Sequence, residues 1–309
     1  MKIFLTGASG LVGGAFAQAA ARRGHEVIGT TGTFAGSLAG LARHLPLDLT
    51  ATDALTGHIL DAFPEAIVNC AAISEPAACT ANPARSQTLN VALPELLARL
   101  AHHLSARFIH LSSEQVFAGD HAPYANTAPP APLNLYGRQK LASEQVVHRV
   151  APDFAVTLRA PLLGGNSPSG QRSLHERLFA DWAAGHTPAL FTDELRQVCA
   201  ADNLAEVMVE LCERPEVRGV YHWAGTETVS RLRLAERIRD HFKLTPAQAP
   251  LTATTRAAQP DAARSRPANL SLDLAPLAGH LKTRPEPFGA QLDRLVIPPP
   301  HRAWYHALT

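Results

Sequence analysis

The sequence predicts an α/β fold built on a doubly wound parallel sheet, with a smaller C-terminal lobe. The first observation is a short buried-strand pattern at Lys2–Thr6 that leads directly into a glycine-rich turn and then a helical pattern. The second is that further strand patterns follow at 26–30, 45–49, 66–72, 106–111 and 155–159, separated by helical segments. Because strands that alternate with helices form parallel sheets, this order is typical of Rossmann-type folds.

The turn after the first strand predicts a dinucleotide-binding site. Gly7 permits a tight turn, Gly10 lets the backbone approach a pyrophosphate, and Gly13 lets the helix from Leu11 to about Arg23 pack closely. The N-terminus of that helix would face the phosphates. The cofactor contacts expected here are Gly7, Ser9, Gly10, Leu11, Val12 and Gly13. The alternative is a glycine-rich turn that binds no ligand.

The end of the second strand bears on the choice between NAD and NADP. In NAD sites an acidic residue at this point binds the ribose 2′-hydroxyl. Here the strand at 26–30 runs into Thr31 and Gly32 without an Asp or Glu, and the nearest arginine is Arg43. An acid would repel the 2′-phosphate of NADP, so its absence predicts NADP, with NAD still possible. We expect Thr31 to border the cofactor.

The third strand is expected at 45–49 and to reach the adenine end of the cofactor. It would place Asp48 and Leu49 beside the base. Asp48 could equally serve only to start the next helix, at 54–63.

Later segments are expected to complete the cofactor site. The fourth strand, 66–72, ends in small residues that leave room for ribose and phosphate, namely Cys70, Ala71 and Ala72. Pro161, after the strand at 155–159, is expected to border the nicotinamide. Asn90 lies in a leucine-rich helix at 83–103. There it is either a satisfied core residue or a residue that holds a water or the backbone near a catalytic lysine.

A serine, a tyrosine and a lysine carry the predicted chemistry. The strand at 106–111 delivers Ser113 at its C-terminal end, the edge of an open α/β sheet where ligands bind. Tyr136 and Lys140 are four residues apart in a helix that Asn134 can cap, so they lie on the same face. The segment is therefore a candidate catalytic site.

This trio suits the reduction of a carbonyl group. A free tyrosine has a pKa of about 10, too high to exchange a proton readily at neutral pH. We expect the Lys140 cation and an oxidised nicotinamide to lower that pKa. Ser113 would then hydrogen-bond a substrate carbonyl while Tyr136 supplies the proton. The alternative is a solvated Lys140 beside a half-buried Tyr136.

The rest of the chain is expected to be shared between the sheet and a lobe. Residues 1–163 are predicted to form the Rossmann domain, and segments near 195–223 to return to its sheet. Residues 164–194 and 224–309 are predicted to form the substrate-binding lobe.

Two helices in this part carry charged residues of interest. Asp202 is expected to cap a helix at 204–214. The amphipathic helix at 230–242 carries several arginines, which we interpret as a solvated face. They are Arg231, Arg233, Arg237 and Arg239.

Composition excludes several classes of partner. The formal net charge is +1 and no basic block occurs, which argues against nucleic acid. No apolar run reaches membrane-spanning length, and the chain begins with a strand pattern rather than a signal peptide. No cluster of metal-ligand spacing is present, and the four cysteines form no Cys-x-x-Cys pair. We expect a soluble, cytoplasmic protein with reduced thiols and no metal.

Four segments together resemble those of an extended short-chain dehydrogenase/reductase: 6–13, 69–72, 112–117 and 136–140. On the segments 132–137 and 266–273, the chain is similar to dTDP-4-dehydrorhamnose reductases. On 131–137, 219–225 and the aromatic C-terminus, it is similar to the regulatory β subunit of methionine adenosyltransferase. That subunit is a cofactor-binding partner protein which keeps the same trio, so the trio does not separate the two branches.

The resemblance implies roles for particular residues. Ser113, Tyr136 and Lys140 correspond to the catalytic trio. Substrate contacts are expected from Ser113, Glu114, Gln115 and Arg266, with Arg266 binding a diphosphate through two nitrogens. Glu114 and Gln115 stand where the rhamnose reductases have an aspartate and a tyrosine. Ala15 stands where some of them have a glutamate associated with a magnesium-linked dimer.

Three functions follow as expectations. The first is an NAD(P)H-dependent reductase of a nucleotide-linked 4-keto sugar, a small-molecule substrate. The second is a non-catalytic, NADP-binding regulatory subunit that contacts a protein partner through its tail, His301–Thr309. The third is a sugar-nucleotide epimerase or dehydratase in which Glu114 is a further acid or base. A homodimer is compatible with each of them.

Overall fold

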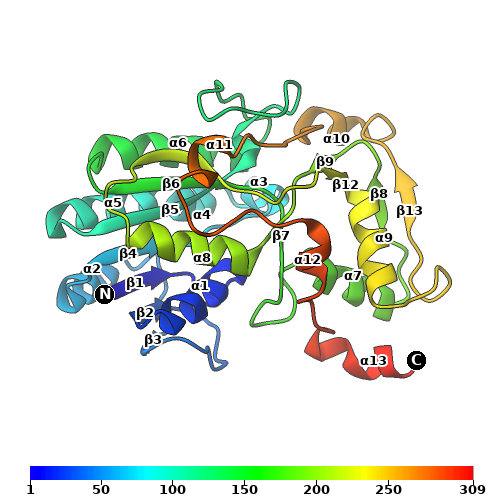
Figure 1. The fold of residues 1–309 in the computed structure, drawn as a ribbon, viewed down its shortest axis with the longest axis horizontal. Coiled ribbons are helices and arrows are strands. Elements are labelled where there is room, and N and C mark those ends of the chain that lie inside the picture. The colour runs from blue at the N-terminus through cyan, green and yellow to red at the C-terminus, as the bar shows by residue number, and fades with distance from the viewer. Residues whose placement is uncertain (309) are drawn as a thin grey trace.

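The computed structural model describes residues 1–308, the side chains of residues 260 and 263 excepted, so Thr309 at the end of the predicted tail lies outside the described residues. Its centre is a seven-stranded parallel sheet in the order β11-β6-β5-β4-β1-β2-β3 (Figure 1). The strands are β1 (Lys2–Thr6), β2 (Glu26–Thr30), β3 (Arg43–Leu45), β4 (Ala66–Asn69), β5 (Arg107–Ser113), β6 (Ala155–Ala160) and β11 (Gly219–His222). The order reverses between β1 and β4, which is where ligands bind in such sheets. The predicted Rossmann-type fold is confirmed.

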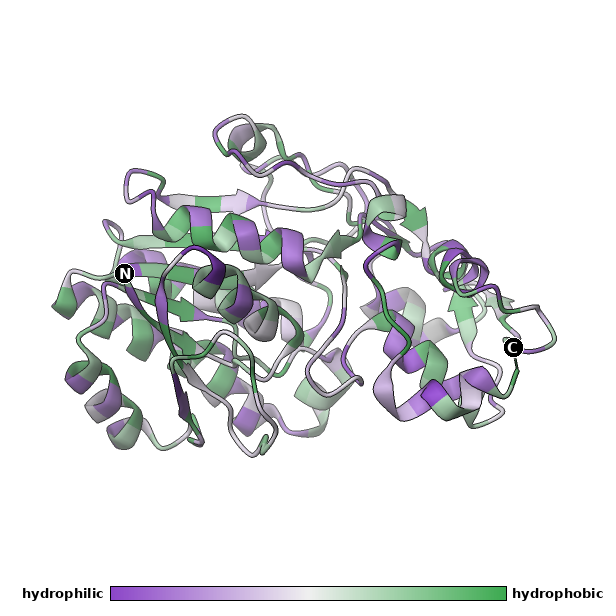
Figure 2. Ribbon diagram, turned by 60° about the horizontal axis from the view of Figure 1, so that its bottom comes forward, coloured by the Kyte–Doolittle hydropathy of each residue, from purple (hydrophilic) through white to green (hydrophobic). Residues whose placement is uncertain are grey.

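Helices cover both faces of the sheet. One face carries α1 (Leu11–Arg22) and α8 (Ala201–Cys212); the other carries α2 (Thr52–Ala62), α5 (Leu93–Leu104) and α6 (Leu135–Val150). Side chains alternate along each strand, so Ile3 and Leu5 of β1 enter the first core and Phe4 enters the second. Figure 2 shows the same pattern as hydrophobic strands beneath helices whose outer faces are hydrophilic.

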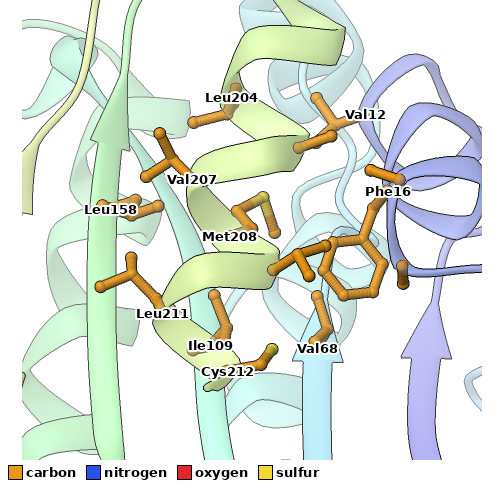
Figure 3. Packing of buried hydrophobic residues seen from close by; sticks show 14 of the residues in the cluster. Val12, Phe16, Val68, Ile109, Leu158, Leu204, Val207, Met208, Leu211 and Cys212 are labelled. Atoms are coloured by element: carbon orange, nitrogen blue, oxygen red, sulfur yellow. The ribbon is translucent and has the colours of Figure 1, made fainter. Parts of the chain in front are cut away.

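The core under α8 fixes this helix against both α1 and the sheet. Figure 3 shows Leu204, Met208 and Leu211 of α8 directed toward the strands and toward Phe16 of α1. All four side chains are fully buried. Burying such side chains contributes roughly 1.5–3 kcal/mol each, so α8 is held rigidly between the glycine turn of α1 and the lobe.

Two predicted elements begin or end elsewhere. The third strand was expected at 45–49, but β3 ends at Leu45, because Pro46 has no N–H to donate to a neighbouring strand. The helix predicted after Asp202 already begins at Ala201, so Asp202 lies inside its first turn and does not cap it. Asp202 instead forms an ion pair with Arg294, whose Nε is 2.7 Å from Asp202 Oδ2.

The helix predicted at 83–103 is interrupted. It consists of α4 (Pro83–Gln87), a π-helical turn (Thr88–Ala92) and α5, and a further short helix, α3 (Pro76–Ala81), precedes it. Pro94 cannot donate a hydrogen bond to the carbonyl of Asn90 four residues earlier, which favours a wider turn at this point. The π turn rotates Asn90 into the protein, where it is fully buried.

A second body lies beside the sheet, at the right of Figure 1. Its helices are α7 (Leu174–Ala183), α9 (Arg231–His241), α12 (Phe288–Leu292) and α13 (Arg302–His306). Its short strands pair as β8 (Ala189–Phe191) with β13 (Thr252–Thr254), and β9 (Leu195–Arg196) with β12 (Val229–Ser230). The remaining pair is β7 (Leu163–Gly164) with β10 (Cys199–Ala200), between the body and the sheet. The domain boundaries given above stay a prediction.

The aromatic tail packs on this second body. Trp304 and Tyr305 of α13 contact the buried ring of Phe179. The Tyr305 hydroxyl donates a hydrogen bond to the Phe242 carbonyl at 2.9 Å. Arg302 and His306 of the same helix are exposed.

Within residues 1–308, no helix is both long and apolar enough to cross a membrane. Over the same range, no three His, Cys, Asp or Glu side chains gather as a metal site would require. All four cysteines are free thiols.

Candidate dinucleotide and catalytic site

The glycine turn at the end of β1 leaves no room for side chains. Gly7 has a φ of +74°, a conformation that other residues rarely adopt. A Cβ atom at Gly7 would lie 2.8 Å from the Ala71 backbone nitrogen, and one at Gly13 would lie 2.1 Å from the Gly7 carbonyl oxygen. Both positions therefore require glycine, and the predicted close approach of α1 is confirmed.

This turn fits a dinucleotide pyrophosphate. Gly10 is the N-cap of α1, and no side chain caps the helix there. The first turn contains no acidic residue either. Its backbone N–H groups and the positive end of the helix are therefore free to meet an anion. Ser9, Leu11 and Val12 lie in the same segment, and Ser9 Oγ donates to the Thr31 carbonyl at 3.2 Å. That bond joins the turn to the end of β2.

No acidic side chain lies at the end of β2. Thr31 Oγ1 is 2.5 Å from Nε2 of His44, and Arg43 precedes His44 on β3. Asp48 lies beyond β3 and is exposed, and its Oδ1 accepts a hydrogen bond from the Thr50 backbone at 3.0 Å. That bond lowers the pKa of Asp48. Since Ala51 is the N-cap of α2, Asp48 does not cap this helix, and its contact with adenine, like that of Leu49, stays a prediction.

Asn90 holds the loop that follows β4. Its Oδ1 accepts from the Ile73 N–H at 2.9 Å, and its Nδ2 donates to the Ile73 carbonyl at 3.0 Å and to Gln139 Oε1 at 2.9 Å. The structure thus makes Asn90 a satisfied core residue that fixes the chain next to Cys70, Ala71 and Ala72. Pro161, the predicted border of the nicotinamide, is buried directly after β6.

The predicted trio is brought together at the C-terminal end of β5. Asn134 caps α6 by accepting a hydrogen bond from the Gly137 N–H at 2.9 Å, as expected. Tyr136 and Lys140 then face β5, with Lys140 Nζ 6.0 Å from the centre of the Tyr136 ring. Ser113 lies beside the Tyr136 hydroxyl and favours its ionised form. The alternative of a solvated lysine is excluded, because Lys140 is only 3% exposed.

Burial dominates the electrostatics of the trio. It raises the pKa of Tyr136 well above its usual value, and the neighbouring Ser113 opposes this only in part. It lowers the pKa of Lys140 to about 8, against the effect of Glu144. The expectation that Lys140 lowers the tyrosine pKa is therefore wrong for the protein alone, because desolvation outweighs the nearby charge.

A buried ion-pair cluster follows Ser113. Glu114 Oε1 is 3.2 Å from Arg196 Nε, and Arg196 Nη2 is 3.0 Å from Glu194 Oε1. Burial raises the pKa of Glu114 to about 8 despite Arg196, and its Oε2 has no hydrogen-bond partner among the described residues. Gln115 is half-buried and accepts a hydrogen bond from Asn134 at 3.0 Å. Glu114 is thus a buried carboxyl group whose only ion-pair partner among the described residues is Arg196.

Arg266 already has a carboxylate partner. Its Nε is 2.7 Å from Glu194 Oε2, and its Nη2 is 3.3 Å from Glu194 Oε1. Its side chain is 44% exposed, so the predicted contact with a diphosphate would compete with Glu194.

The interpretation of the α9 arginines as a solvated face holds only for Arg233, whose side chain is 58% exposed. It is wrong for Arg231, which is 13% exposed and lies 3.8 Å from Glu194, and for Arg237 and Arg239, which are 24% and 16% exposed.

Three residues of the site, Arg196, Glu194 and Glu144, were not predicted from the sequence. Arg196 and Glu194 carry no motif and meet Glu114 only through the tertiary fold. Glu144 had a usable signal, because it follows Lys140 by four residues, as Lys140 follows Tyr136.

A glycine turn at the switch point of an open parallel sheet, with a buried Ser-Tyr-Lys group at the end of β5 on the same edge, defines a Rossmann-type protein with the architecture of dehydrogenases and reductases. Within that class, the chain belongs to the RmlD substrate binding domain family, whose sequence model matches residues 1–298.

Relatives fall into two branches. Methionine adenosyltransferase 2 subunit beta of Xenopus laevis is 31% identical over 292 residues, covering 89% of this chain and 81% of that protein. A probable low-salt glycan biosynthesis reductase of Haloferax volcanii, Agl14, is 30% identical over 288 residues, covering 91% and 92%. The resemblance to both a reductase and a regulatory subunit is confirmed.

Solved structures share the fold. A hypothetical dTDP-4-dehydrorhamnose reductase from Sulfolobus tokodaii has a TM-score of 0.80 at 25% identity, covering 96% of this chain and 100% of that one. The dTDP-4-dehydrorhamnose reductase from Bacillus anthracis in complex with NADP has a TM-score of 0.79 at 18% identity, covering 95% and 96%.

Proposed function

We propose that the protein is an NADP(H)-dependent reductase of a nucleotide-linked keto sugar. The observation that carries the proposal is the convergence of Ser113, Tyr136 and Lys140 at the C-terminal end of β5, on the same edge of the sheet as the glycine turn after β1. Family membership supports it, as does the similarity to the probable reductase Agl14 and to the solved dTDP-4-dehydrorhamnose reductases. NAD remains the alternative cofactor.

Tyr136, Ser113 and Lys140 would each have a separate role in the reduction. A bound nicotinamide supplies the hydride to the carbonyl carbon. Because the pKa of Tyr136 is raised, its hydroxyl keeps the proton at neutral pH and is a donor to the carbonyl oxygen. Ser113 orients that oxygen. Lys140, with a pKa of about 8, is mostly charged at pH 7 and stabilises the phenolate left behind until solvent returns the proton.

The cofactor would lie across the switch point. Gly7, Gly10 and Gly13 would admit the pyrophosphate, and Cys70 to Ala72 would line the ribose-phosphate on the β4 side. Lys140 would also bind the nicotinamide ribose. Glu114 and Arg266 are the groups available to a sugar and a diphosphate.

Oxidation of NADPH with a panel of 4-keto sugar nucleotides tests the proposal. We expect NADPH loss with dTDP-4-dehydro-6-deoxy-L-lyxo-hexose or a related substrate, and none with the Tyr136→Phe variant as the matched control. Conversion of a sugar nucleotide without net NADPH loss would instead indicate an epimerase or dehydratase. No reaction across the panel would contradict the reductase.

A second candidate function rests on the adenosyltransferase relatives. In it, the protein would bind a methionine adenosyltransferase and change its kinetics. Because Trp304 and Tyr305 pack on the second body, deleting the tail would disturb the fold. The double variant Arg302→Ala/His306→Ala changes only two exposed residues of α13, so it tests docking to the adenosyltransferase without disturbing the fold. The second function would be established by two results together. The wild-type protein would co-elute with the adenosyltransferase while the double variant would not, and no keto sugar nucleotide would cause NADPH loss.

NADPH is expected to bind at least tenfold more tightly than NADH, a difference of about 1.4 kcal/mol. The reason is the absence of an acid beside Thr31, where His44 and Arg43 lie instead. Calorimetric titration with both cofactors measures this. Thr31→Asp is the matched variant and should reverse the order, since a carboxylate repels the 2′-phosphate. Tighter binding of NADH by the wild type would refute the prediction.

A further inference from the structure

The last three residues of β5 each contact one of three residues on α6. The Leu111 carbonyl accepts from Lys140 Nζ at 2.9 Å. The next residue, Ser112, donates from Oγ to Glu144 Oε1 at 2.5 Å. The third, Ser113, lies beside the Tyr136 hydroxyl and acts to lower its pKa. Residues 136, 140 and 144 are one helical turn apart and share a face, so the strand end and the helix face are matched residue for residue.

Glu144 is held from a third element as well. Arg159 of β6 binds it with Nε 2.9 Å from Oε1 and Nη2 2.7 Å from Oε2. Both side chains are almost completely buried. Arg159 is itself fixed, because its guanidinium lies 5.0 Å from the centre of the Phe117 ring and its Nη1 is 3.4 Å from His222 Nε2. The Glu144 carboxylate is therefore held in a fixed position by an ion pair with Arg159.

Stability alone does not account for this pair. Removing two charges from water is costly, and a buried ion pair is often no more stabilising than two apolar side chains of similar size. The position of the Glu144–Arg159 pair suggests a further role. Glu144 is one helical turn beyond Lys140, and its hydrogen-bond donor Ser112 is adjacent to Ser113. The pair lies where it can act on the trio.

We propose that Ser112, Glu144 and Arg159 form a clamp that sets α6 against the end of β5 and supplies the counter-charge for Lys140. These are positioning residues, since each acts through Lys140 or Tyr136. The catalytic consequence rests on the proposed reductase function; the effect on Lys140 does not.

Glu144 is the anion that acts on the Lys140 ammonium group. Cys70 and Cys79 also act in this direction, but burial raises the pKa of both thiols, so they carry almost no charge at pH 7. The other titratable or charged groups around Lys140 and Glu144 are His110 of β5, Tyr136 and His148 of α6, and Arg159 of β6. Burial lowers the pKa of both histidines, so they stay neutral at pH 7.

The charge on Lys140 can be measured directly, because the chain has only four lysines: Lys2, Lys140, Lys243 and Lys282. Protein labelled with ¹³C-lysine gives four Cε signals, and loss of one signal in Lys140→Arg assigns Lys140. Titration from pH 6 to 10 should give a pKa of about 8 for the wild type. Glu144→Gln should lower it by about one unit. Glu95→Gln, the same change in a surface ion pair, should leave it unchanged.

A folded Glu144→Gln protein whose Lys140 pKa stays within about 0.2 units of wild type would overturn the proposal. If Arg159 left unpaired prevents folding, Glu144→Gln/Arg159→Met removes both charges and the same criterion applies. Glu144→Asp keeps the charge with a shorter side chain and should restore the pKa. The titration needs no substrate. A lowered Lys140 pKa with no turnover on any keto sugar would therefore refute the reductase while supporting the clamp.

Discussion

Replacing Tyr136 with Phe is expected to lower turnover by about 10²–10⁴-fold, the usual contribution of one general acid. The ring remains in its buried site beside Lys140, and only the hydroxyl next to Ser113 is lost. The dissociation constant for NADPH should therefore stay within about twofold of wild type. Single-turnover kinetics with NADPH and the active keto sugar measure the chemical step.

Tyr221→Phe is the matched control, the same change at a half-buried tyrosine of β11. It should have wild-type turnover. A Tyr136→Phe enzyme within a factor of two of wild type would remove this hydroxyl from the mechanism. In the wild type, the rate of reduction should fall as the pH rises through about 8, because Lys140 then loses its charge.

Replacing Arg196 with Met is expected to lower the free energy of unfolding by about 3–5 kcal/mol at pH 8. Arg196 is 3% exposed and lies between Glu114 and Glu194. Methionine replaces only the aliphatic part of this side chain. Glu114 therefore loses its only ion-pair partner within the described chain, and the carbonyls of Leu195, Pro267 and Ala268 lose the hydrogen bonds that Arg196 donates. Urea denaturation measures the loss.

The size of this loss should depend on pH. The pKa of Glu114 is already raised to about 8, and removing Arg196 raises it further. At pH 8 the carboxyl is already half protonated, so the penalty from Glu114 is at most about 0.4 kcal/mol. This part should vanish at pH 5, where the carboxyl is protonated in both proteins, while the rest of the loss remains. Arg233→Met, at an exposed ion pair with Glu236, should cost less than about 1 kcal/mol. A loss at Arg196 no larger than this control would contradict the prediction.

The parts of the fold that were predictable are those with local causes. The turn at Gly7 and Gly13 needs residues without a Cβ, and the spacing of Tyr136 and Lys140 places them on one helix face. The end of β3 also has a local cause, the missing N–H of Pro46. The strand was nevertheless predicted to continue to residue 49, because the residues after Pro46 follow a hydrophobic pattern.

Other features depend on tertiary burial and have no local signal. The raised pKa of Tyr136 comes from desolvation by the assembled protein. The buried position of Arg231, read from sequence as a solvated face, depends on Glu194, which lies in a distant loop. The ion pairs of Arg196 with Glu114 and Glu194 likewise form only when the second body packs against the sheet.

The path of the chain has a consequence for synthesis on the ribosome. The last strand of the central sheet, β11, pairs with β6, yet the chain between them contributes α7, α8 and the strands β7 to β10. A nascent chain that has reached Ala160 therefore presents β6 as an unpaired edge until Gly219–His222 has emerged. Open parallel edges invite pairing with other chains. We expect that a pause in translation within 161–218 would increase aggregation, and that one placed after His222 would not.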